Sequence, residues 1–317
     1  MNITLPDGSI RELDLGSTGL DLASSIGPGL AKAAIAVTVN GVQRDLSDPI
    51  NEDSSVSIIT IDSDEGLEIM RHTLTAQVLA RAVKNLYPGT KLAIGPTITD
   101  GFYYDFEFKK PISPEDLESI EKEMKKIIAG NSSITKSFHT KEEAINVFRN
   151  EGESYKESIV SDSQQEDNFQ LYTQDDSEFV DLCRGPHLPN LKHIGAFKLT
   201  KLAGAYWKGD SKNKMLTRIY GTAWKNEKDL NAHLHTIEEA EKRDHRKLGK
   251  EMNLFHFQEE APGMVFWHPD GWTIYRLLQN FIRSKLEKSS YKEINTPQVV
   301  DRKLWEQSGH WDKYQEH

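Results

Sequence analysis

The residues best suited to chemistry lie in one short stretch, Asp181-Leu182-Cys183-Arg184-Gly185-Pro186-His187. Cys183 is the only cysteine of the chain, and a histidine follows it four residues later, after an arginine and a Gly-Pro turn. A thiol and an imidazole at this spacing can bind a metal ion or hold a water molecule. The same spacing is also typical of a tight turn around a buried cysteine, and structural zinc normally has four ligands. Both interpretations stay open at this point.

The charge of the chain is distributed unevenly along the sequence. The net charge of -10 argues against a protein that coats nucleic acid without selectivity. Residues 151–190 hold ten acids and two bases, a net charge of -8, whereas residues 201–250 hold twelve bases and seven acids, a net charge of +5. The second region predicts a local surface that contacts phosphate, although a solvated helix face of mixed charge has the same composition.

The first 62 residues predict a small β-rich unit. In residues 35–46, Val37 and Val39 alternate with polar residues and Asn40-Gly41 fits a two-residue hairpin turn. A second strand is expected at residues 55–61, and a short helix at 20–30 is interrupted by Gly27-Pro28-Gly29. The pattern suggests a β-grasp-like module, which ends at the polar run 62–66.

The elements that must position the Cys183 stretch follow this unit. A helical period begins at Leu67 and ends at Pro88. A charged helix is expected around residues 114–128, mixed with short strands up to about Trp224. The strands are expected at residues 91–94, 101–108, 179–182, 196–199 and 215–220. The sequence therefore predicts an α+β domain around the site.

The remainder of the chain reads as a connector and a further helix. Residues 226–254 contain no proline and one glycine, which favours one long charged helix. An amphipathic helix is expected at residues 274–286 and a strand at 291–300. No apolar run approaches the roughly 20 residues of a membrane span, and the N-terminus lacks a signal peptide, so we expect a cytoplasmic chain with no membrane contact.

A series of motifs then resembles the bacterial threonyl-tRNA synthetase family, in the same order and over essentially the whole chain. The matching segments are Ile94-Gly95-Pro96, Gly101-Phe102-Tyr103-Tyr104-Asp105, Gly152-Glu153-Ser154-Tyr155-Lys156, Cys183-Arg184-Gly185-Pro186-His187, Ala203-Gly204-Ala205-Tyr206-Trp207-Lys208-Gly209-Asp210, Arg218-Ile219-Tyr220-Gly221-Thr222-Ala223-Trp224, Lys242-Arg243-Asp244-His245-Arg246-Lys247 and Gly263-Met264-Val265-Phe266-Trp267-His268.

The resemblance implies a multidomain α+β protein. It implies a β-grasp TGS domain at residues 1–62, a tRNA-editing (second additional) domain at 66–225, a linker helix at 226–254, and the beginning of a class II aminoacylation domain at 255–317. That last part is built in the family around an antiparallel sheet, and the chain would contain only its motif 1. The family's adenylate-binding motifs and threonine-binding zinc site would lie beyond His317, so the chain itself should not activate threonine.

The implied function is that of a threonine-tRNA ligase, to which this part contributes tRNA binding and hydrolytic editing. A pocket sized for threonine gains only about 1 to 3 kcal/mol over serine, roughly 10- to 200-fold, so a second site must remove serine from mischarged tRNA. The alternatives are a free-standing seryl-tRNA(Thr) deacylase and a non-catalytic tRNA-binding paralogue. A stringent-response regulator with a TGS domain has no place for the Cys183 to His187 motif.

Matched residue by residue, the editing site of the family implies five residues here: His72, Lys156, Asp181, Cys183 and His187. The resemblance assigns the two histidines, Asp181 and Cys183 to holding the ester and an attacking water. Lys156 would stabilise developing negative charge.

The helix that carries His72 departs from the family pattern. The family has a second histidine four residues later, whereas here one residue is inserted and Gln77 stands in its place. A π-bulge could absorb the insertion and bring His72 and Gln77 together, and an alignment without the insertion puts Thr73 and Gln77 at the two histidine positions. Because glutamine cannot act as acid or base, we predict slower hydrolysis than in relatives with both histidines, or an editing site that survives only as structure.

The remaining expectations concern partners and cofactors. Lys242, Arg243, Arg246 and Lys247 on the linker helix are expected to contact the phosphate backbone of tRNA(Thr), because their spacing can put several on one face. The family enzyme uses ATP, Mg²⁺ and Zn²⁺, but no cofactor or metal site is expected in this chain. Motif 1 implies a homodimer for the complete enzyme.

Overall fold

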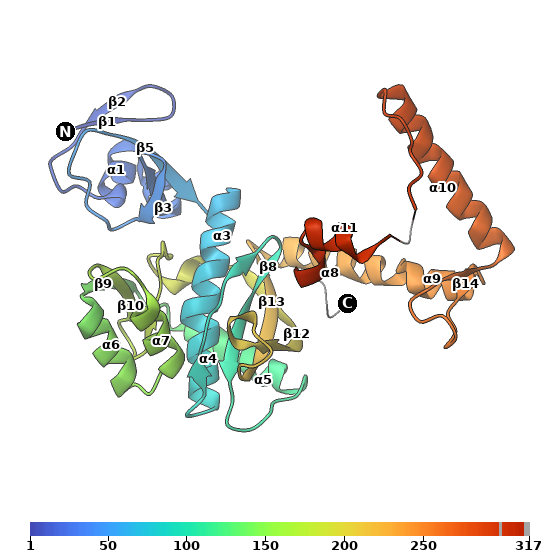
Figure 1. Cartoon of the computed structure of the whole chain (residues 1–317). Helices are drawn as coiled ribbons and strands as arrows, with labels where there is room; N and C mark the ends of the chain where they lie inside the picture. Colours follow the sequence, from blue (N-terminus) through green and yellow to red (C-terminus); the bar gives the residue numbers. More distant parts are fainter. Residues whose placement is uncertain (298–299, 314–317) are drawn as a thin grey trace. The chain divides into compact units, whose positions relative to one another are not determined.

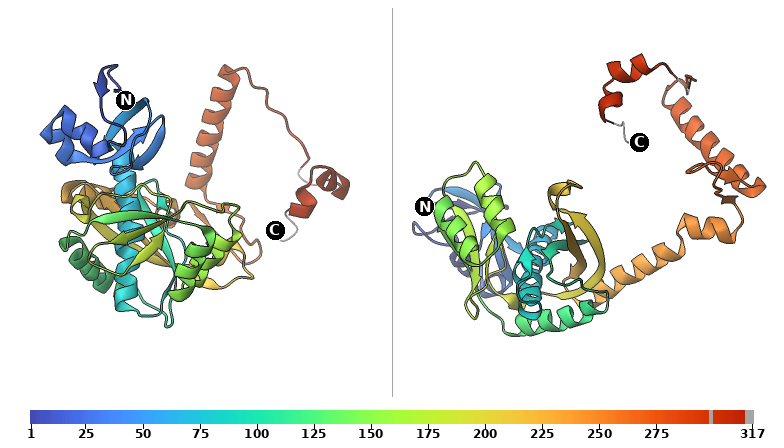
Figure 2. Two further views of the ribbon diagram at one scale, coloured as in Figure 1. Left: turned by 90° about the vertical axis from the view of Figure 1, so that its left-hand side faces the viewer. Right: turned by 60° about the horizontal axis from the view of Figure 1, so that its bottom comes forward.

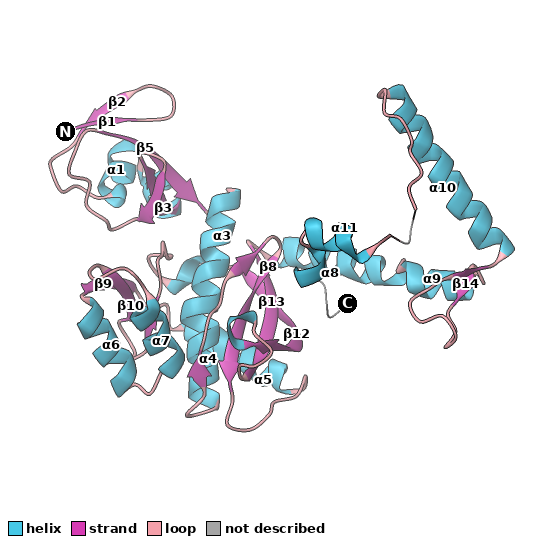
Figure 3. Ribbon diagram, in the orientation of Figure 1, coloured by secondary structure: helices cyan, strands magenta, loops and turns pink. Residues whose placement is uncertain are grey.

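A computed structural model of the chain describes residues 1–297 and 300–313 (Figure 1). The chain divides into two compact units, Met1–Leu234 and His235–His317, which we describe separately. Figure 3 shows that both contain helices and strands. The α+β, multidomain fold class predicted from the sequence is confirmed.

The N-terminal part of the first unit is a mixed five-stranded sheet with the order β2-β1-β5-β3-β4. Strands β1 and β5 are parallel and the other neighbours are antiparallel. Helices α1 (Gly19–Ile26) and α2 (Pro28–Ala33) are separated at Gly27, as predicted. The strands are β1 (Asn2–Thr4), β2 (Ile10–Glu12), β3 (Ala34–Val39), β4 (Val42–Asp45) and β5 (Ser54–Thr60).

The predicted hairpin turn is present between β3 and β4. Asn40 and Gly41 both have positive φ angles, 49° and 81°, as a type I′ turn requires. The turn fixes the register in which Ala36 lies opposite Asp45, at the end of β4. In this register Asp45 lies at the end of the edge strand β4, where it contacts Tyr172 and His187 of the following domain.

One long helical segment leads from this sheet into the rest of the unit. Helix α3 (Asp64–Thr73) begins at the cap residue Ser63, continues through η1 (Leu74–Leu79) and ends as α4 (Ala80–Leu86). The segment η1 is a π-helix, in which the backbone N–H of Ala80 donates to the carbonyl of Thr75, five residues back. The π-bulge predicted from the inserted residue is therefore confirmed.

The helical segment contacts two antiparallel sheets (Figures 1 and 2). On one side, β8 and β13 of the larger sheet pack against it. On the other side, Gln174 of the smaller sheet bonds to Gln77 in the π-helix. The larger sheet has the order β12-β13-β8-β6, with β7 also paired to β8, and the smaller has the order β11-β10-β9.

The larger sheet is built from β6 (Lys91–Leu92), β7 (Thr97–Ile98), β8 (Gly101–Glu107), β12 (Ala196–Tyr206) and β13 (Met215–Trp224), and the smaller from β9 (Ile134–His139), β10 (Phe169–Gln174) and β11 (Val180–Leu182). The helices are α5 (Asp116–Ala129), α6 (Lys141–Asn150) and α7 (Ser154–Asp162), with short 3-10 turns η2 (Leu191–His193) and η3 (Trp207–Gly209). Strands β9 and β10 and helices α6 and α7 were not predicted from the sequence.

The two parts of the first unit share a hydrophobic core. Ile35, Ala36 and Ile59 of the N-terminal sheet belong to the same buried cluster as Met70, Val78 and Phe102. A second cluster, around Leu22 and Val37, lies within the N-terminal part alone. Burial of apolar side chains across the junction holds the two parts together.

The connector differs from the single helix expected at residues 226–254. It consists of α8 (Glu227–Lys242) and α9 (His245–Glu251). The break follows from Asp244, whose carboxylate accepts a hydrogen bond from the backbone N–H of Arg246 and so caps a new helix.

The second unit has little sheet structure. Strands β14 (Phe255–His256) and β15 (Phe266–Trp267) form a two-stranded antiparallel pair. The predicted amphipathic helix is α10 (Pro269–Lys288), followed by α11 (Arg302–Gln307) and α12 (His310–Lys313). The strand expected at 291–300 is wrong for the described part, because residues 291–297 and 300 have no regular structure, and residues 298–299 lie outside the described residues.

No helix in the described part of the chain is both long enough and apolar enough to cross a membrane.

Candidate active site

A cavity of about 810 Å³ lies in the first unit, between the helical segment and the two sheets. The side chains that line it include His72 from α3, Tyr104 from β8 and Lys156 from α7. Asp181 of β11 and Cys183, the residue after β11, also line the cavity. The structure therefore brings together residues separated by more than one hundred positions in sequence.

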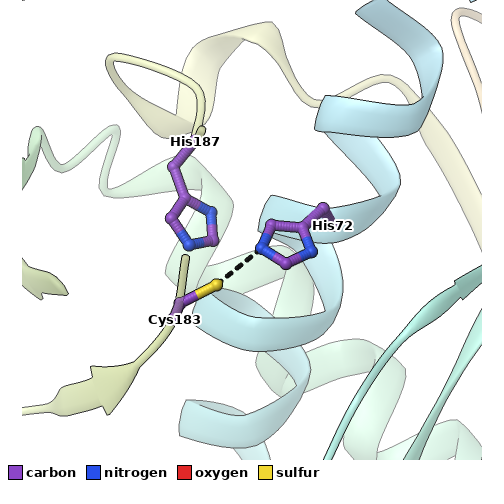
Figure 4. A group of neighbouring side chains, drawn as sticks. All are labelled: His72, Cys183 and His187. Atoms are coloured by element: carbon purple, nitrogen blue, oxygen red, sulfur yellow. Dashed lines mark hydrogen bonds between the residues drawn. The ribbon is translucent and has the colours of Figure 1, made fainter. Parts of the chain in front are cut away.

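The thiol of Cys183 lies beside the imidazoles of His72 and His187 (Figure 4). Its sulfur is 2.6 Å from Nε2 of His72, close enough for a hydrogen bond whose direction depends on the histidine tautomer. The rings of His72 and His187 stack with their centroids 4.6 Å apart. Three of the five predicted editing residues thus form one polar group.

His187 is almost fully buried, and its ring is held on several sides. Its Nδ1 lies 3.1 Å from the hydroxyl of Thr73, and the edge of the Tyr172 ring packs against it with centroids 4.4 Å apart. Its other nitrogen, Nε2, is buried with no oxygen or nitrogen partner among the described residues. His187 itself is not among the residues that line the cavity, and it lies next to two that do, His72 and Cys183.

Burial sets the protonation state of both histidines. Loss of solvent lowers the pKa of His72 below its usual 6.5, although Asp181 acts in the opposite direction. Burial also lowers the pKa of His187, against the opposing effect of Cys183. Both imidazoles are therefore neutral near pH 7, the state in which a histidine can accept a proton.

Lys156 and Asp181 form a buried ion pair beside these histidines. Nζ of Lys156 lies 2.6 Å from Oδ1 of Asp181, and both side chains are at most 5% exposed. Burial alone would lower the pKa of Lys156, but Asp181 and Tyr104 outweigh it and raise the pKa. The lysine is charged, and its Nζ lies 5.6 Å from the centre of the Tyr104 ring at the cavity wall.

Gln77 lies apart from this group. Its side chain is fully buried, and its Oε1 accepts a hydrogen bond of 3.2 Å from Nε2 of Gln174 in β10. The cavity wall is formed by Ala76 in its place. The bulge is present, but the contact expected between Gln77 and His72 is replaced by the contact with Gln174.

The same three side chains could in principle hold a cation. One nitrogen each from His72 and His187 and the sulfur of Cys183 lie within 4.8 Å of one another. Two histidines, a thiolate and an open fourth position would suit Zn²⁺ at a catalytic site. The same donors also suit a water molecule.

The four basic residues predicted to contact tRNA do not lie on one helix. Lys242 ends α8, Arg243 lies in the break, and Arg246 and Lys247 lie in α9. Three of them are engaged in ion pairs, Lys242 and Arg243 with Glu239 and Arg246 with Asp244. The single basic face expected from their spacing is therefore interrupted at residue 243.

Three further residues were missed as site residues by sequence reasoning. Thr73 bonds to His187, and only the alternative alignment of the helix gave a signal for it. Tyr104 lies within the matched Gly101 to Asp105 segment, where its residue type alone gave no role. Asp45 accepts a hydrogen bond from the backbone N–H of His187 across 142 residues, and no local pattern could have found it.

Two family models match this chain. The TGS domain model matches residues 1–60, and the model described as the threonyl and alanyl tRNA synthetase second additional domain matches residues 170–220. The second match includes Asp181, Cys183 and His187. The resemblance identified from the motifs is confirmed at both places.

Similar proteins cover the whole chain. The threonine–tRNA ligase of Hahella chejuensis is 54% identical over 314 residues, 99% of this chain and 49% of that protein. The threonine–tRNA ligase of Maricaulis maris is 55% identical over 317 residues, 100% of this chain and 49% of that protein. The chain thus spans about half the length of the curated relatives it matches.

Proposed function

We propose that this chain, which resembles threonine–tRNA ligases over its entire length, carries out the hydrolytic editing of seryl-tRNA(Thr) for such a ligase. The observation that carries the proposal is the cluster of His72, Cys183 and His187, of which His72 and Cys183 line a cavity of about 810 Å³. A buried, charged lysine lies in the same wall.

The reaction is the hydrolysis of an ester. A water oxygen attacks the carbonyl carbon of the seryl group while one of the neutral imidazoles accepts a proton from the water. The charge that develops on the carbonyl oxygen is stabilised by the ammonium group of Lys156. The bond between the acyl carbon and the ribose oxygen then breaks, and the ribose oxygen takes the proton from the imidazolium. Serine and tRNA are released.

Each side chain of the cluster has a distinct task in this scheme. We assign proton acceptance to His187, whose Nε2 is buried beside Cys183 and His72 and lacks an oxygen or nitrogen partner among the described residues. Thr73 keeps its ring oriented through Nδ1. His72 and Cys183 hold the water and the ester, and Asp181 keeps Lys156 charged and in place.

The wider assignment belongs to the same proposal. We divide the chain into a TGS domain (1–62), an editing domain (66–225), a linker (226–254) and the beginning of a class II domain (255–317). The partner is tRNA(Thr), contacted in part by Lys242, Arg243, Arg246 and Lys247, and the compartment is the cytoplasm. Aminoacylation with ATP, Mg²⁺ and Zn²⁺, and dimerisation through motif 1, are attributed to the complete ligase.

Deacylation of purified seryl-tRNA(Thr) tests the proposal. We expect the chain to release serine, with His187→Ala and Lys156→Met each reducing the rate by about 100-fold or more. Threonyl-tRNA(Thr) serves as the control substrate and should be spared. A chain that binds the tRNA without accelerating hydrolysis would overturn the proposal and support a non-catalytic tRNA-binding role.

A further inference from the structure

A carboxylate from the N-terminal sheet is buried next to the proposed editing site. Asp45, the last residue of β4, is only 7% exposed. It lies in the region matched by the TGS model, far in sequence from Cys183 and His187. A buried charge is costly unless it is paired and hydrogen-bonded, so its partners indicate what it does.

Among the described residues, every hydrogen bond and ion pair of the Asp45 carboxylate is made with the editing domain. Oδ1 accepts the backbone N–H of His187 at 2.7 Å. Oδ2 accepts the hydroxyl of Tyr172 at 2.8 Å and pairs with Nζ of Lys136 at 2.8 Å. Lys136 also pairs with Asp48 at 2.5 Å, so the lysine has two carboxylates and Asp45 has three donors.

Two of these donors determine where the imidazole of His187 lies. The peptide nitrogen that Asp45 holds belongs to His187 itself, and the Tyr172 ring that it also holds packs edge-on against the imidazole. The turn around them has no free space. A Cβ atom at Gly185 would lie 2.1 Å from the Tyr172 oxygen.

The contact between the two domains is close on the side of His187 and open on the side of Lys136. A cavity of about 20 Å³, room for about one water molecule, lies beside Asp45, Tyr172 and His187, whereas one of about 440 Å³ is lined by Asp45, Lys136 and Tyr172. Apolar residues of both domains share one core. The shared core and the three donors hold Asp45 in place, and Asp45 in turn holds the turn that carries Cys183 and His187.

We propose that Asp45 is a positioning residue for the hydrolysis, so that the TGS domain completes the editing site by fixing the turn that carries Cys183 and His187. The inference rests on the editing function proposed above. A misplacement of about 1 Å in a catalytic group can cost about 100-fold in rate, which is the size of effect that this contact can control.

The competing explanation is that Asp45 only attaches one domain to the other through Lys136. Asp45→Asn separates the two roles, because the amide oxygen can still accept from His187 while the charge that pairs with Lys136 is lost. Asp48→Ala is the matched control, since Asp48 pairs with the same lysine but is not bonded to the turn.

The experiment measures seryl-tRNA(Thr) deacylation by the full chain. We expect Asp45→Ala to lower kcat by about 10- to 100-fold with little change in KM, whereas Asp45→Asn and Asp48→Ala stay within about 3-fold of the unaltered chain. Equal losses in all three variants would support simple attachment and overturn the inference. Unchanged kcat in a folded Asp45→Ala variant would also overturn it.

A second readout is independent of activity. Cys183 is the only thiol, so its alkylation rate with iodoacetamide reports the state of the turn. We expect Asp45→Ala to increase this rate at least about 3-fold and Asp48→Ala to leave it unchanged. An unaltered chain that does not hydrolyse seryl-tRNA would refute the proposed function, while the alkylation rates would still decide the role of Asp45.

If Asp45→Ala does not fold, Tyr172→Phe takes its place. This variant keeps the ring against His187 but removes the hydroxyl that anchors the ring to Asp45. We expect a loss of kcat of several fold and faster alkylation of Cys183, and the inference fails if neither changes.

Discussion

Oppositely charged side chains meet in both units of the chain, but in different surroundings. Lys156 and Asp181 in the first unit are 2.6 Å apart and 5% and 2% exposed. Lys242 and Glu238, one helical turn apart in α8, are 2.8 Å apart and 54% and 61% exposed. The two distances are nearly equal, so they do not show how much each pair affects stability. Loss of one partner costs far more free energy in the buried pair, because the remaining charge is no longer solvated.

The largest effect is expected from Asp181→Ala. The variant leaves the Lys156 charge buried without a partner, and we expect the free energy of unfolding to fall by about 3–5 kcal/mol in chemical denaturation. Replacing both residues, as Asp181→Leu with Lys156→Met, should recover most of this loss. If the single variant were as stable as the unaltered chain, the pair would behave like an exposed one and the comparison would fail.

A second effect of burial concerns the pH dependence of hydrolysis. Because burial lowers the pKa of His72 and His187 below 6.5, the imidazoles stay neutral as the pH falls through 6.5 and become protonated only below it. We expect deacylation to persist at pH 6.5 and to fall only at lower pH. The rate of the His187→Ala variant gives the background, and an acid limb centred above pH 6.5 would contradict the expectation.

A smaller effect is expected from restoring a second histidine. The sequence alone suggested Gln77→His, but Ala76 forms the cavity wall and Gln77 bonds to Gln174. We expect Ala76→His to raise the deacylation rate by several fold. Gln77→His should give no gain, because its side chain is directed to β10, and a large gain from it would show that the helix rearranges.

The smallest effect is expected at the exposed pair. Glu238→Ala removes one partner of Lys242, which remains fully solvated and close to Glu239. We expect no measurable shift of the Tm in calorimetry. A shift as large as that caused by Asp181→Ala would remove the distinction between the two pairs.

Local patterns in the sequence predicted the elements with strong local signals. Asn40-Gly41 specified a turn, and the spacing of Ile69, Leu79 and Val83 specified a helix. The π-helical segment was suggested only by the residue inserted relative to the family pattern. The strand Ile134–His139 gave no comparable signal, because several of its alternate residues are polar and exposed. The end of α8 was missed because the capping role of Asp244 appears only with the backbone conformation around it.

The proposed site was predictable to the extent that its residues lie in matched motifs. His72, Lys156, Asp181 and Cys183 all line the cavity, and His187 lies beside them. The exact neighbours were not predictable. Whether Gln77 or Ala76 faces the cavity depends on where the π-turn begins, and the bond from His187 to Asp45 depends on how two domains pack.

The π-turn at Leu74–Leu79 also preserves the phase of the helix. In a regular helix, one extra residue would rotate everything after it by about 100° and would turn the apolar face of Ala80–Leu86 away from the core. The wider π-helical turn takes up the extra residue without this rotation, so that Ala82 and Val83 remain buried. Removing one residue from this turn should therefore shorten the helix without altering which side faces the core, which makes the segment a tolerant place for length variation beside an otherwise rigid site.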